Sequence, residues 1–116
     1  MSSEIDRVAA LLAAGEPAPR DDLATAARSI AAELAARHPG KSIEVRIPPF
    51  AAVQVGAAGG DGPTHRRGTP PNVVELAPET AVSLATGSMK WDDAVAHALV
   101  RYSGAHAGDV AAMLPL

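Results

Sequence analysis

The side chains best suited to chemistry in this sequence lie in one short basic segment, His65, Arg66 and Arg67. In an extended strand, residues 65 and 67 share one face, whereas Arg66 points to the other. A guanidinium presents a fork of donors that matches a carboxylate or a phosphate, and Thr69 and Asn72 follow at the adjoining turn. The spacing predicts a polar anion or headgroup site made by His65, Arg67, Thr69 and Asn72.

A structural role for the same segment is the alternative. Arg67 could pair with Glu75 on a neighbouring strand and hold the proline-rich turn between them. Under the anion-site hypothesis, Arg67→Ala weakens ligand binding and leaves the melting temperature almost unchanged. Under the turn hypothesis the same substitution lowers stability, so one variant separates the two.

Metal and cofactor sites are not predicted. His38, His65, His97 and His106 are spread along the chain without an i, i+4 pair, and the chain contains no cysteine. Structural and catalytic metals need ligands that converge, commonly histidines and cysteines at short spacings.

The sequence also shows no arrangement of residues that is typical of a catalytic site. Ser103 lies near His106, but no serine has the G-x-S-x-G context of a nucleophile elbow. Asp92 and Asp93 are neighbours, and neighbours on a helix point about 100° apart. We therefore expect no catalytic residues and no enzyme activity.

Composition narrows the class of protein. The chain has 116 residues, of which 47% are hydrophobic, 20% charged and 3% aromatic, with a net charge of -3. These values predict one folded domain and argue against nucleic-acid binding. We see neither a secretory signal nor an apolar run of about 18 residues that could span a membrane. The lack of cysteine fits the cytoplasm.

Two helices are predicted first. Residues 2–14 form a short helix, and a linker with two prolines ends at Pro19. The longer helix starts with Asp21 or Asp22 as its cap and runs to about Arg37. We expect a single domain of residues 1–116, in which residues 1–19 are a helical arm and linker and residues 20–116 the core.

The rest of the chain indicates strands and short helices. Alternation or turn signals predict strands at residues 43–47, 50–56, 64–68, 72–76 and 99–103, and helices at 78–87 and 89–98. Segregated helices and strands are typical of an α+β fold. We expect a mainly antiparallel, five-stranded sheet covered by helices. Its edge strand at 64–68 could pair between two chains to form a homodimer.

A family resemblance rests on several of these motifs. The segments 75–80 (ELAPET), 84–87 (LATG), Trp91 and 103–104 resemble the C-terminal half of sterol carrier protein-like domains. Residues 50–54 and 65–72 resemble a bacterial branch, which is similar to the C-terminal domain of mycothiol-dependent maleylpyruvate isomerases. The resemblance covers roughly residues 22–116 and implies helices over a five-stranded sheet, with an apolar cavity for fatty-acyl or sterol-like ligands.

The chain departs from the family in two respects. Only a dozen residues follow Gly104, so we expect the long C-terminal helix of lipid-carrying members to be truncated. The metal-binding histidines of the isomerases belong to a separate domain, so their chemistry does not carry over.

We therefore expect a non-catalytic carrier of a small apolar or amphipathic ligand. The predicted cavity-lining residues are Val45, Ile47, Val53, Val55, Val74, Leu84, Trp91, Val100 and Met113. The alternative is an accessory domain whose basic turn, with His65 and Arg67, contacts a partner enzyme or a small anionic metabolite. An interior cavity of several hundred Å³ would favour the carrier, and a filled core would favour the accessory domain.

Overall fold

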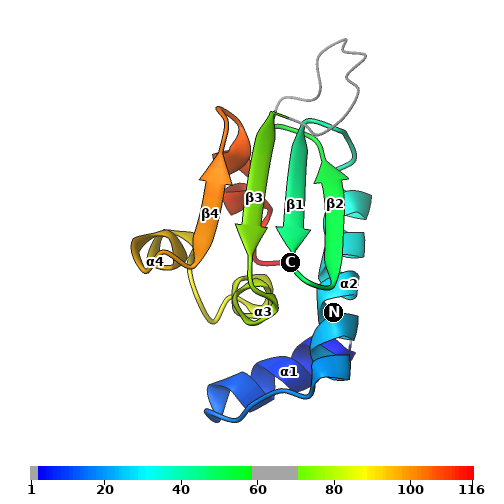
Figure 1. Cartoon of the computed structure of the whole chain (residues 1–116), viewed down its shortest axis with the longest axis vertical. Coiled ribbons are helices and arrows are strands. Elements are labelled where there is room, and N and C mark those ends of the chain that lie inside the picture. Colours follow the sequence, from blue (N-terminus) through cyan, green and yellow to red (C-terminus); the bar gives the residue numbers. More distant parts are fainter. Residues whose placement is uncertain (1–2, 59–70) are drawn as a thin grey trace.

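The computed structural model describes residues 3–58 and 71–116. The elements of these residues are α1 (Ser3–Ala13), α2 (Arg20–Arg37), β1 (Ile43–Ile47), β2 (Ala51–Val55), β3 (Asn72–Leu76), α3 (Pro78–Thr86), α4 (Trp91–Ala96), β4 (Val100–Ser103) and the 3-10 helix η1 (Ala107–Met113). The described strands form one four-stranded sheet in the order β2-β1-β3-β4. Helix α2 and η1 lie behind the sheet in Figure 1, and α3 follows β3 at its lower end.

The sheet is mixed, which corrects the expected five-stranded, mainly antiparallel one. β1 pairs antiparallel with β2 but parallel with β3, and β4 pairs antiparallel with β3. Ile43 lies opposite both Val55 and Asn72, so β2 ends and β3 begins at the same end of the sheet. β3 therefore runs opposite to β2, and because β1 lies between them, β3 is parallel to β1. The α+β class is confirmed, and the predicted strand at 64–68 lies outside the described residues.

Alternation along β1 gives the sheet two different faces. Ile43, Val45 and Ile47 are buried, whereas Glu44 and Arg46 are partly exposed. We call these the inner and the outer face. After β1, the chain turns at two prolines, and the amide of residue 50 donates to the Ile47 carbonyl at 3.0 Å. This tight turn explains why β1 and β2 pair as a hairpin.

Helix α2 starts two or three residues earlier than expected, and the prediction of an aspartate cap is wrong. Pro19 occupies the cap position, without a side-chain hydrogen bond to the helix. Asp21 and Asp22 instead lie in the first turn, where carboxylates interact favourably with the helix dipole. The buried face of α2 is rich in alanine, and its two large buried side chains are Ile30 and Leu34.

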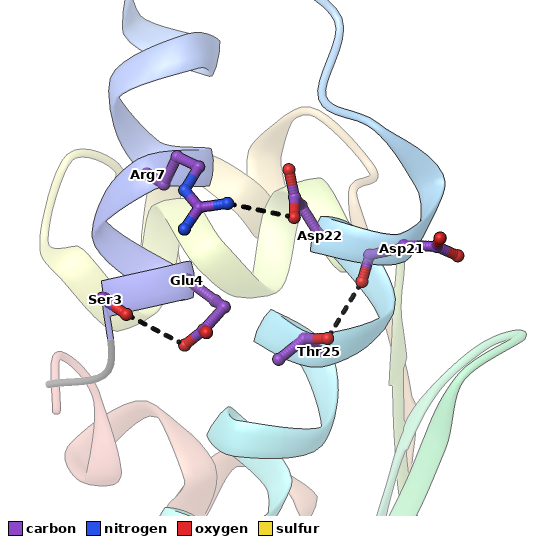
Figure 2. A network of polar contacts seen from close by, with 6 residues as sticks. All are labelled: Ser3, Glu4, Arg7, Asp21, Asp22 and Thr25. Atoms are coloured by element: carbon purple, nitrogen blue, oxygen red, sulfur yellow. Dashed lines mark hydrogen bonds and ion pairs between the residues drawn. The ribbon is translucent and has the colours of Figure 1, made fainter.

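Helix α1 packs against α2 and α3. Ile5 and Val8 are 0% exposed, and each buried aliphatic side chain stabilises the fold by roughly 1.5–3 kcal/mol. The Arg7 guanidinium lies 3.4 Å from the Asp22 carboxylate across the two helices (Figure 2). The Arg7 side chain is 58% exposed, so this pair adds at most about 1 kcal/mol. Apolar packing therefore holds α1 in place.

The α3 boundaries agree with the sequence signals. Pro78 is the first helical residue, and Gly87 ends the helix in a left-handed conformation with a φ of 81°. The amide of Leu116 donates to the Ala85 carbonyl at 3.0 Å, which ties the C-terminal segment to α3. Across residues 3–58 and 71–116, none of the helices has the length and apolar character to cross a membrane.

Candidate functional site

A narrow apolar space lies between the inner face of the sheet and the helices, and we call it the seam. Its lining residues are Ile30, Leu34, Val45, Ile47, Leu76, Ala81, Val110 and Leu114. All of these side chains are aliphatic, so the seam presents no hydrogen-bonding side chain to a guest. Chemically, it suits a hydrocarbon chain or ring.

The volume of the seam is small, about 10 Å³. This is roughly the space that one water molecule needs, whereas typical ligand pockets measure about 300–1,000 Å³. The space is therefore closed, and a lipid-sized guest would need its walls to move apart.

Two of the predicted lining residues, Val45 and Ile47, do border the seam. The other predicted lining residues belong to the same apolar core without bordering it. Those that are buried are Val55, Val74, Leu84, Val100 and Met113, and those that are partly buried are Val53 and Trp91.

Sequence reasoning missed the lining residues that do not come from β1. Ile30 and Leu34 lie on the apolar stripe of α2, so helical spacing was a usable signal for them. Leu76 and Ala81 flank the β3–α3 junction, where the sequence shows only that both are apolar. Nothing local indicates that Val110, from η1, reaches the same space.

Asn72 is buried, with 5% exposure, and its amide group connects three segments. Its Nδ2 donates to the Ser42 carbonyl at 2.9 Å, and its Oδ1 accepts from the His106 amide at 2.9 Å. A side-chain amide can make both bonds because it carries a donor and an acceptor. Asn72 therefore links β3 to the start of β1 and to the turn before η1. The other predicted polar ligands, His65, Arg67 and Thr69, lie outside the described residues.

The outer face of the sheet carries the charges. Arg46 lies opposite Glu75 on β3, and Glu75 lies opposite Arg101 on β4. Arg46 also contacts Glu44 on its own strand, with an Nη2–Oε2 distance of 2.8 Å. Positive and negative groups alternate across this face, so their fields largely cancel.

Two shallow depressions on this face share Arg46 and Glu75. Their volumes are about 300 and 380 Å³, and both are open to solvent. They are larger than the seam, but both are surface hollows. The first is bordered by three charged side chains, and the second mainly by the proline turn and the start of β2. They do not shield a guest from water.

Two of the described histidines have side-chain partners close in the sequence. His97 Nδ1 lies 2.8 Å from the Asp93 carbonyl oxygen, and His106 Nδ1 lies 3.4 Å from Asp109 Oδ2. Within the described parts of the chain, no three His, Asp or Glu side chains gather as metal ligands would.

Comparison with protein families gave a match over most of the chain. The model of the family described as bacterial SCP ortholog, where SCP is sterol carrier protein, matches residues 19–116. The matched region begins at the cap of α2 and leaves α1 outside. A search of curated proteins found no match.

Proposed function

Because the chain belongs to the family of bacterial sterol carrier protein orthologs, we propose that it is a non-catalytic carrier of a small apolar or amphipathic ligand. The seam is the observation that supports this proposal. Every side chain around it is aliphatic, and it lies between the sheet and the helices. The apolar tail of a guest held there would be transferred from water to an aliphatic environment.

Burial of the ligand's apolar surface alone would supply the free energy for micromolar binding. Removing roughly 300 Å² of ligand surface from water contributes about 7–8 kcal/mol, and micromolar binding corresponds to about 8 kcal/mol. The cost of separating the closed walls is subtracted from this gain. We therefore expect dissociation constants at or above the micromolar level.

The test is a titration of the full chain with an environment-sensitive fluorescent fatty acid, together with mass spectrometry of solvent extracts. We expect saturable binding at one site. Ala81→Leu should weaken it by at least about tenfold, because Ala81 borders the seam and added methylenes fill it. Ala52→Leu is the matched control, since Ala52 is an exposed residue of β2. If both variants bind the fatty acid as tightly as the parent does, the guest binds outside the seam.

A second function is favoured by the small volume of the seam. A filled core fits an accessory domain that contacts a partner enzyme or a small anion through its surface. In that case the folded protein gives no saturable titration with the fatty acid and no extracted lipid.

A further inference from the structure

We propose that α1 is a displaceable clasp that gates entry of the apolar guest into the seam. This inference rests on the proposed carrier function. It concerns the regulation of that site by a helix that lies outside the family match.

The first step concerns which walls can move. A space of about 10 Å³ cannot admit even a short acyl chain. Ile30 and Leu34 come from α2 and Ala81 from α3, while Val45 and Ile47 come from β1. β1 is hydrogen-bonded to a strand on each side. α2 and α3 are held to the sheet mainly by side-chain packing, with one backbone bond from the Gly56 amide to the His38 carbonyl at the C-terminal end of α2. The seam therefore widens most readily when α2 and α3 separate.

The second step concerns what holds these two helices together. α1 contacts both α2 and α3, and it lies across the lower end of the molecule in Figure 1. Its Ile5 and Val8 are fully buried in the common core. While α1 stays docked, it packs against both α2 and α3 and so holds them together. Separation of α2 from α3 therefore requires α1 to release at least one of them.

The third step concerns how α1 is attached. One polar contact between α1 and α2 is the exposed Arg7–Asp22 pair (Figure 2). The other bonds drawn there stay within one helix, from Ser3 to Glu4 and from Thr25 to the Asp21 carbonyl. No strand pairing has to break when α1 moves.

The linker after α1 suits such a motion. Residues 13–17 are exposed, and Gly15 has a positive φ of 74°. Pro17 and Pro19 carry no amide hydrogen, so two positions of the linker need no donor partner. The amides of Gly15 and Glu16 donate to carbonyls of α1, so these bonds move with α1 and the hinge can lie after them.

A reversible tie between α1 and α2 tests the clasp. The chain has no cysteine, so Arg7→Cys with Asp22→Cys supplies the only two thiols. A bifunctional thiol reagent with a cleavable disulfide then closes the tie in the folded full chain. The control pair, Glu33→Cys with Arg37→Cys, replaces another surface ion pair, with a 2.9 Å contact inside α2. Both proteins are titrated with the fluorescent fatty acid before closure, after closure and after cleavage.

We expect closure of the α1–α2 tie to raise the apparent Kd by at least about tenfold, because it removes the binding-competent state. Cleavage should restore the original value, and the control tie should change Kd less than about twofold. An unchanged Kd, or equal weakening by both ties, would overturn the clasp. If the untied protein does not bind the probe at all, the carrier function fails, and the clasp fails with it.

A second variant tests the opposite direction. Val8→Ala shortens an anchor of α1 and should populate the released state more often, so the apparent Kd should fall a few-fold. Adding the probe to the parent protein should also speed amide exchange in residues 3–13. An unchanged or weaker affinity of Val8→Ala, with slower exchange in α1, would contradict the proposal.

Discussion

Ile47 and Arg46 are neighbours on β1, yet they lie on opposite faces of the sheet. Ile47 is 0% exposed and borders the seam, while Arg46 lies on the outer face beside Glu44 and Glu75. The inner face is apolar and tightly closed, and the outer face is charged and hollowed. The site that we propose for an apolar guest thus lies on the side with the least free volume, and the proposal therefore requires that its walls move.

Truncation on the inner face should have the largest effect. We expect Ile47→Ala to lower the free energy of unfolding by about 2–5 kcal/mol, because it leaves a cavity in a packed core. The neighbouring Arg46→Ala should cost less than about 1 kcal/mol. Denaturant unfolding measures both. Similar losses of unfolding free energy for the two variants would mean that the outer face is also covered.

Asn72 tests whether a polar residue on the buried side behaves like the aliphatic ones. Asn72→Ala removes the partner of the Ser42 carbonyl and of the His106 amide. We expect a loss of about 2–4 kcal/mol in unfolding free energy. Ser103→Ala, at an exposed position of β4, is the control and should stay within about 0.5 kcal/mol. A loss below about 1 kcal/mol for Asn72→Ala would show that water replaces its bonds.

Gly104 tests the close packing around Asn72 through the backbone. Its φ is 101°, and an added Cβ would contact the Asn72 amide oxygen and lie 2.6 Å from the Pro71 carbonyl oxygen. Gly104→Ala should cost about 1–3 kcal/mol. At Gly108 an added Cβ meets nothing within 4 Å, so Gly108→Ala should be neutral or stabilising by up to about 1 kcal/mol. Equal melting temperatures for the two variants would refute the close packing at Gly104.

The smallest effect is expected from the charges of the outer face. A double-mutant cycle on Glu44 and Arg46 should give a coupling of about 1 kcal/mol or less, since the Arg46 side chain is 42% exposed. Added salt should reduce the coupling. A larger, salt-insensitive coupling would indicate that this pair is shielded from water.

Most element boundaries were predictable because their signals are local. Alternation identified β1 as Ile43–Ile47, and Pro78 with Gly87 bracketed α3. The strand order was not predictable in this way. The parallel pairing of β1 with β3 depends on how the chain passes from β2 to β3, and alternation carries no information about a partner. The helix cap was missed because a proline fits that position as well as an aspartate in the pattern.

The apolar character of the seam was predictable from the sequence, but its volume was not. Alternation identified Val45 and Ile47 as inward-facing, and both border the seam. Whether space remains there depends on how closely α2 approaches the sheet. Small buried side chains such as Ala27 and Ala31 permit a close approach, so an alanine-rich helix gives a filled core. The ligand roles of His65 and Arg67 stay predictions.

Trp91 is the only tryptophan of the chain, and its ring lies 6.2 Å from the ring of Tyr102 at an angle of 47°. Tyr102 belongs to β4, which is last in the order of the described strands, and is 51% exposed. The indole therefore reports on the contact between α4 and β4. Its emission and near-ultraviolet circular dichroism should change when α4 or β4 separates from the rest of the fold. Occupancy of the interior by a lipid calls for an extrinsic chromophore, because a guest in the seam can leave the indole and its surroundings unchanged.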